Sequence, residues 1–305
     1  MLAGGKVPVN TDTFQNDLQN FVKWLFENDC YNIAMESTGV YWRPVYEAIE
    51  EYSQYYESIL VANAHNMRNI PGRKTDVKDA EWIATLFQHG LLEPSFVPER
   101  TIRDLREFSR TYKNSVSEKV RCLNRLEKFL QTHGFKLSSV LSDINSVSGI
   151  RILTILSEKG SLAVSDVQNA ISSNTKKSAY EIQLAVCGRL NPNECFLLSD
   201  FLDQLNLIQS HIDKILSKMQ EIAAPYANIL EQLDSIPGID ITAALLILAE
   251  IGSNPQDHFK TSAHLCSWAG LSPRNDESAG KIKSKKILPG NPYIKSILCQ
   301  VSWVA

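Results

Sequence analysis

The sequence lacks the patterns that mark several common classes of protein. Its 305 residues contain no run of 18 apolar residues, which excludes a conventional transmembrane helix. Residues 1–10 do not show the charged and apolar segments of a signal peptide, so we expect a cytoplasmic protein with no membrane partner. The 6 cysteines form no CxxC pair, which argues against zinc fingers and against a compact disulfide framework.

The chain also lacks a large excess of either charge. A formal net charge of −3 is too small for a protein that coats nucleic acid through bulk charge, so any such contact must be local. Two short segments, residues 68–78 and 281–286, are nonetheless basic. The cations that could hold phosphate groups are Arg68, Arg73, Lys74 and Lys78 in the first segment, and Lys281, Lys283, Lys285 and Lys286 in the second.

The remaining composition is that of a globular chain. A hydrophobic content of 44% supports substantial cores, and 305 residues favour two domains or one domain with a long insertion. Over residues 1–98 helices and strands alternate as in an α/β domain, with buried strands expected at residues 31–37 and 58–64. Glu36 ends the first strand, where open α/β sheets bind ligands. A solvated edge carboxylate is the alternative interpretation.

Residues 68–90 contain the highest density of acidic and basic side chains beside an apolar helical stripe. Asp76, Asp79 and Ile83 recur with helical spacing, which places both carboxylates on one face. Like charges one turn apart repel, so a metal, a cation or a proton commonly neutralises such a pair. The same spacing fits an ordinary helix start, in which the helix dipole favours acids and Thr75 is the N-cap.

Two heptad patterns predict long helices in the middle of the chain. Seven of nine core positions are apolar in the first pattern, with Ser109 and Lys119 as exceptions, and all eight are apolar in the second. Such helices form a coiled-coil arm that either packs as a hairpin or dimerises, although ordinary bundling needs no partner. The apolar positions are Ile102, Leu105, Tyr112, Val116, Leu123, Leu126 and Leu130, followed by Leu198, Phe201, Leu205, Ile208, Ile212, Ile215, Met219 and Ile222.

The last part of the chain contains two further patterns. Residues 235–252 place a Pro-Gly turn with Gly238 between apolar helices, as in a helix-hairpin-helix whose backbone N–H groups face phosphate, although a plain helical corner has the same pattern. Residues 271–291 form a polar loop in which Ser278 lies in a tight Glu-Ser-Ala-Gly turn. This serine is either a nucleophile or an ordinary turn residue.

Taken together, these motifs resemble those of the DEDD transposases of bacterial insertion sequences, which are relatives of the pilin-gene invertases. The motifs are MESTGVYWRPVYEAI at residues 35–49, GRKTDVKDAEWIA at residues 72–84, SIPGI at residues 235–239, and the downstream AGLSP, ESAGK and PGN. They occur in the family's order and at similar separations. The resemblance therefore covers nearly the whole chain.

The resemblance implies a fold of the α/β plus α class. Its parts are a ribonuclease H-like domain similar to Holliday-junction resolvases at residues 1–98, a coiled-coil arm with an inserted helical segment at residues 99–224, and a helical C-terminal domain with a helix-hairpin-helix at residues 225–305. The family's motifs map its acids onto Glu36, Asp76 and Asp79, and its nucleophile onto Ser278. The resemblance implies that these three acids hold Mg²⁺.

The resemblance also implies the activity and the partners. The activity is metal-dependent DNA cleavage and rejoining, the partner is DNA, some members use a guide RNA, and the arm is expected to mediate homo-oligomerisation. The family's first aspartate, on a Gly-Ile-Asp strand, has no counterpart after Met1, and its last basic helices would follow Ala305. We therefore expect impaired strand transfer. The alternatives are a structure-selective endonuclease that uses water and a non-catalytic remnant that binds nucleic acid.

Overall fold

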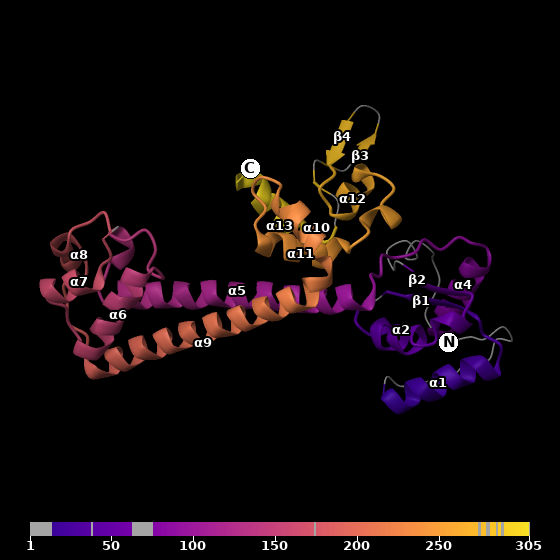
Figure 1. The fold of residues 1–305 in the computed structure, drawn as a ribbon, viewed down its shortest axis with the longest axis horizontal. Coiled ribbons are helices and arrows are strands. Elements are labelled where there is room, and N and C mark those ends of the chain that lie inside the picture. Colours follow the sequence, from indigo (N-terminus) through magenta and orange to yellow (C-terminus); the bar gives the residue numbers. More distant parts are fainter. Residues whose placement is uncertain are drawn as a thin grey trace. The chain divides into compact units, whose positions relative to one another are not determined.

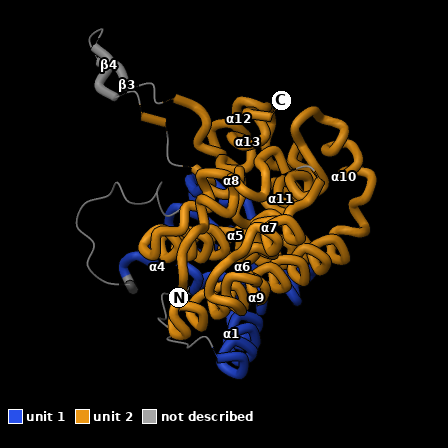
Figure 2. The backbone as a smooth tube through the Cα atoms, turned by 90° about the vertical axis from the view of Figure 1, so that its left-hand side faces the viewer, with its two compact units in different colours: residues 1–97 blue, residues 98–305 orange. Residues whose placement is uncertain are grey.

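The computed structural model describes the chain as two compact units, residues 1–97 and 98–305, which Figure 2 shows in blue and orange. For residues 76–77, 276–278 and 281–284 the backbone alone is described. The described residues are 14–37, 39–62, 76–173, 175–273, 276–278, 281–284, 286–287 and 290–304.

The first unit contains a two-stranded parallel sheet. Its strands are in register from Asn32 opposite Ser58 to Glu36 opposite Ala62. A helix between them makes the crossover that a parallel pair requires. Strands are therefore present where they were expected, at residues 32–36 and 58–62, although the first is half-buried rather than buried and residues 63–64 lie outside the described residues. The elements are α1 (Gln15–Glu27), β1 (Asn32–Glu36), α2 (Trp42–Glu50), the short 3-10 helix η1 (Ser53–Tyr55), β2 (Ser58–Ala62) and α4 (Asp76–Gln88).

The core of this unit forms because α1 is apolar on one face. Leu18, Phe21, Val22 and Leu25 follow the spacing of one helical stripe, and all four side chains are buried. Phe21, Val22 and Leu25 cluster with Ile49 of α2, while β1 packs at the edge of this cluster. Burial of each large apolar side chain stabilises the fold by about 1.5–3 kcal/mol. This cluster therefore packs the helices against the sheet.

Two long helices dominate the second unit. Helix α5 (Arg100–Thr132) and helix α9 (Pro192–Ala223) lie side by side in opposite directions (Figure 1). The rings of Phe129 and Phe201 are 5.7 Å apart near one end of this pair. The helix pair, called the arm below, buries its apolar faces within one chain.

The heptad positions account for the packing of the arm. Every apolar position of the predicted pattern in α9 is buried or half-buried. The two polar exceptions in α5 also face inward: Ser109 is buried, and half-buried Lys119 donates a hydrogen bond to Gln209 of α9. The arm therefore tolerates polar groups at its seam, where Lys119 meets a polar partner from the facing helix.

The connection between α5 and α9 folds into short helices that share one apolar core with the adjoining ends of α5 and α9. Ser146 and Ser178 cap two of these helices, and Asn191 caps α9, which follows. Ser178 with Glu181 and Asn191 with Glu194 form reciprocal capping boxes. Part of the serine and asparagine content of this region thus serves as helix caps. The short helices are η2 (Leu137–Ser139), α6 (Val147–Lys159), α7 (Val164–Ala170) and α8 (Ala179–Ala185).

The C-terminal elements pack onto the other end of the arm. One core joins Ile102 and Leu105 of α5 and Met219 of α9 to the apolar helix α11 and to α13. The elements are η3 (Ala224–Tyr226), α10 (Ala227–Asp234), α11 (Ile241–Ile251), η4 (Pro255–Asp257), α12 (Ser262–Trp268), β3 (Asp276–Ser278), β4 (Lys281–Ser284) and α13 (Pro292–Val304).

Among the helices that the structure describes, none combines the length and the apolar character needed to cross a membrane.

Candidate functional site

Glu36 is the last residue of β1. It pairs in register with Ala62 of β2, and the next backbone N–H, from Ser37, donates to the carbonyl of Ala62 at 3.0 Å. Because the strands are parallel, both end at this edge of the sheet. The half-buried side chain of Glu36 therefore lies at the carboxyl edge, as expected from the sequence.

The two aspartates lie at the start of α4, one turn apart. Asp76 is the first helical residue, and Asp79 is half-buried. Helix α4 packs against β1, so the structure brings the helix of the aspartates against the strand of Glu36. Gly90, with a φ of 65°, follows the end of this helix, a position that favours glycine.

Part of this predicted site lies outside the described residues. Arg68, Arg73, Lys74 and Thr75 belong to the undescribed segment, and for Asp76 the backbone alone is described. Lys78 is exposed on α4. Among the side chains that are described, no group of three or more His, Cys, Asp or Glu could hold a metal ion. That set lacks Asp76, one of the three predicted ligands.

Ser278 is the last residue of β3 and faces β4 in an antiparallel hairpin. It pairs with Lys281, Glu277 pairs with Ile282, and Asp276 pairs with Ser284. A further bridge between Pro273 and Ile287 closes the base. Ser278 thus lies at the tip of the hairpin, which projects from the C-terminal helices (Figure 1).

The basic residues predicted beside the serine follow the same hairpin. Lys281 and Lys283 belong to β4, where the backbone alone is described, and Lys285 lies outside the described residues. Lys286 is exposed immediately after it. The pairing of Ser278 with Lys281 places one lysine directly across from the predicted nucleophile.

The Pro-Gly turn joins α10 to α11. Gly238 has a φ of 87°, which favours glycine, and the N–H of Ile239 donates to the carbonyl of Ile236 at 3.0 Å. Asp240 caps α11 by accepting from the N–H of Ala243 at 2.7 Å. The turn predicted from the sequence is present. The N–H of Ile239 already donates a hydrogen bond within the turn.

A buried polar cluster, which the sequence-based interpretation missed, lies at the end of α11. Glu250 of α11 is fully buried, and its carboxylate accepts from Arg110 Nε and Nη2 at 3.2 Å each. Asn291 Nδ2 donates to Glu250 Oε2 at 2.6 Å, and Arg106 Nε lies 3.7 Å from the same oxygen. We call Glu250, Arg106, Arg110 and Asn291 the Glu250 cluster.

The Glu250 cluster also closes the end of α11. Arg106 donates to the backbone carbonyls of Ala249 and Glu250, at 3.0 and 2.7 Å, which are among the acceptors that a helix end leaves unpaired. Burial lowers the pKa of Arg106 to about 10, although the adjacent Glu250 raises it. The arginine therefore stays charged at neutral pH and remains a partner for the carboxylate.

A sequence signal for this cluster exists. Glu250 is the one charged residue of the apolar helix α11, and an acid inside such a helix needs a buried partner. Arg106 and Arg110 are four residues apart on α5, which places both on one helix face. The sequence does not show which arginines the acid meets, because they precede it by 144 and 140 residues.

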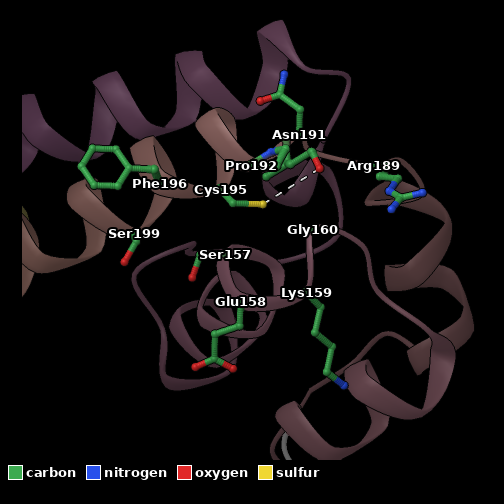
Figure 3. Close-up of a pocket in the computed structure, with 11 residues that line it drawn as sticks. Ser157, Glu158, Lys159, Gly160, Arg189, Asn191, Pro192, Cys195, Phe196 and Ser199 are labelled. Carbon is green, nitrogen blue, oxygen red and sulfur yellow. Dashed lines mark hydrogen bonds between the residues drawn. The ribbon is translucent and has the colours of Figure 1, made fainter.

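A separate pocket of about 750 Å³ lies at the far end of the arm (Figure 3). Cys195 and Arg189 line it, and the thiol of Cys195 is 4.0 Å from the carbonyl oxygen of Leu190. None of the predicted site residues lines this pocket. Its place is between α6 and the start of α9, within the helical connection.

Two family models match the chain. The model of DEDD transposases of the IS110 type, described as a transposase, matches residues 2–135. The model described as the transposase IS116/IS110/IS902 family matches residues 230–305. The first match contains β1 and α4, and the second contains α11 and the serine hairpin. No curated protein matches the chain.

Proposed function

The chain belongs to the DEDD transposases of the IS110 family, and we propose that it cuts and rejoins DNA through the hydroxyl of Ser278 in a metal-dependent reaction. The family makes it a DNA recombinase of insertion sequences. The observation that carries the proposal is the hairpin register, which sets Ser278, at the end of β3, across from Lys281. A cation paired with the serine attracts the phosphate that the serine hydroxyl would attack.

The acidic residues of the first unit supply the metal site in this proposal. Mg²⁺ is bound by oxygen ligands, above all carboxylates. Half-buried Glu36 and Asp79 lie on elements that pack together, and Asp76 precedes Asp79 by one turn. These three residues fit the metal chemically, and they would hold it. When bound, Mg²⁺ neutralises charge on the phosphate and favours deprotonation of a hydroxyl.

The serine reaction conserves the number of phosphoester bonds. In the first step the Oγ of Ser278 bonds to phosphorus and loses its proton, while one deoxyribose oxygen leaves and is protonated. The DNA end stays joined to the serine. In the second step a hydroxyl of another strand bonds to the same phosphorus, and the serine oxygen leaves and regains a proton. Rejoining therefore requires no ATP.

The other parts of the chain have supporting roles in this proposal. The parallel pair β1 and β2 with a crossover helix supports a ribonuclease H-like fold for residues 1–98, and the buried heptads support a coiled-coil arm within residues 99–224. In this proposal the arm also mediates homo-oligomerisation, through surfaces other than the apolar faces that its two helices bury against each other. Within residues 225–305 the turn at Gly238 acts as a helix-hairpin-helix that contacts DNA phosphates, together with Arg73, Lys74 and Lys78 of the first unit.

In this proposal the protein side chains do not select the target DNA sequence. The basic segments described above suit phosphate contacts, which position a duplex without reading its sequence. A guide RNA would supply the sequence information by base pairing. The protein would then recognise the geometry and the backbone of the paired strands, as its basic segments allow.

Covalent trapping tests the serine role. Protein is incubated with labelled branched DNA and Mg²⁺, then denatured and separated by size. We expect a protein–DNA adduct that Ser278→Ala abolishes and that Ser284→Ala, in the same hairpin, leaves intact. DNA cleavage that persists in the Ser278→Ala variant would instead indicate an endonuclease that uses water.

A further inference from the structure

The structure assigns Glu250 a positioning role: through Asn291 it fixes the base of the hairpin that carries Ser278. This inference rests on the proposed function, because it is the serine whose place is being fixed. Glu250 touches neither DNA nor the reacting atoms in this assignment. It acts through the chain that leaves α12 and returns at α13.

Both ends of the hairpin segment are held together at its base. The N–H of Asn291 donates to the carbonyl of Trp268, the last residue of α12, at 3.1 Å. Gly290, after the hairpin, lies so close to Gly270, before it, that an added Cβ would be 2.2 Å from the backbone nitrogen of Gly270. Between these residues and the strands, Pro273 and Ile287 form a further β-bridge. The departing and returning chains therefore share one fixed base.

Asn291 is the residue in which these constraints meet. Its Oδ1 accepts from the N–H groups of Tyr293 and Ile294, at 2.9 and 3.3 Å, and so caps α13. Its Nδ2 donates to Glu250 at 2.6 Å. The side chain thus joins the returning chain, the start of α13 and the buried carboxylate.

Glu250 is itself held from the arm. The guanidinium of Arg110, which binds its carboxylate, also lies 4.4 Å above the ring of Tyr293 in α13. Lys113 donates to the carbonyl of Tyr293 at 3.3 Å. Helices α5, α11 and α13 therefore meet at one buried carboxylate. Through this carboxylate the base of the hairpin is connected to α5 of the arm.

Exchanging the carboxylate of Glu250 and the amide of Asn291 distinguishes a role in positioning the hairpin from a role in stability alone. Asn291→Asp keeps a capping oxygen for α13 but sets a carboxylate against Glu250. Glu250→Gln removes the charge that faces two guanidinium groups. The double variant Glu250→Gln/Asn291→Asp restores one carboxylate and one amide, with the direction of their hydrogen bond reversed.

The test compares these three variants with the unmodified chain and with Asn191→Asp, which changes the same residue type at the N-cap of α9. Hydrogen exchange of peptides covering residues 271–290 reads the hairpin base without any reaction. We expect about tenfold faster exchange in Asn291→Asp, the factor that loss of one charged hydrogen bond allows, with recovery in the double variant. Asn191→Asp should leave this segment unchanged.

The reaction gives the second readout. Asn291→Asp should lower the rate of adduct formation by about 100-fold, the loss typical of a 1 Å misplacement, with less than about a twofold change in DNA affinity. The double variant should regain most of this rate. Equal hairpin exchange in all variants, or a double variant no better than the single ones, would overturn the assignment. An unmodified chain that forms no Ser278 adduct would instead refute the proposed function, while hydrogen exchange still decides the positioning role.

Discussion

The carboxylate of Glu250 receives both the Nε and Nη2 groups of Arg110 at 3.2 Å, which links α11 to α5 across 140 residues of sequence. The carboxylate is fully buried, whereas the arginine side chain is 39% exposed. Removal of one partner from such an ion pair leaves a buried charge without compensation, which strongly lowers the free energy of unfolding. The packing of α11 on α5 therefore depends on this ion pair.

Removal of Arg110 should destabilise the second unit. We expect Arg110→Ala to lower the free energy of unfolding by about 3 kcal/mol, because Glu250 loses two hydrogen bonds and stays buried. Arg110→Lys should recover part of the loss, since it restores the charge without the paired geometry. Chemical denaturation measures both. An Arg110→Ala variant as stable as the unmodified chain would show that Arg106 and Asn291 satisfy the carboxylate alone.

A charge in the middle of the arm should separate its helices. Ile212 is 6% exposed, so we expect Ile212→Asp to lower the free energy of unfolding by about 3 kcal/mol or more. Leu207 lies on the same helix and is 72% exposed, and Leu207→Asp is the matched control. Thermal unfolding and solution mass report the outcome. Equal effects of the two substitutions would contradict the heptad packing.

The helical connection should lose stability in acid. The pKa of Glu181 is lowered to about 2 because its carboxylate accepts from the backbone N–H of Ser178 and then from Lys177. A carboxyl with a lower pKa when folded contributes its stability above the unfolded value near 4.5 and loses it as the pH falls toward 2. Glu181→Gln should therefore lower the melting temperature at pH 7 and not at pH 2.

The base of the hairpin should not accept a larger residue at position 290. A Cβ there would meet backbone atoms of Ala269 and Gly270 at 2.5 and 2.2 Å, which flexible side chains cannot relieve. We expect Gly290→Ala to displace the hairpin and to lower the rate of adduct formation by about 100-fold. Gly134→Ala, where a Cβ meets nothing within 4 Å but the φ of 82° is unfavourable for alanine, tests whether backbone strain away from the hairpin has the same effect on the reaction.

Local sequence patterns predicted the helices and strands better than the contacts between distant elements. The alternating residues before Glu36 predicted a strand, which is half-buried rather than buried, and the heptads from Leu198 to Ile222 predicted the inward face of α9, because both signals depend on residues close together in the sequence. The Glu250 cluster was missed, since its partners come from α5 and α13 and no local spacing relates them. The roles of Glu36, Asp76, Asp79 and Ser278 remain predictions that follow from family motifs.

The most direct measurement is mass spectrometry of the protein after reaction with branched DNA and Mg²⁺. Nuclease digestion would leave a nucleotide on any serine joined to DNA, and protease digestion would locate it. The account predicts a nucleotide phosphate on the peptide that contains Ser278, absent in Ser278→Ala. Cleaved DNA with an unmodified Ser278 peptide would contradict the account.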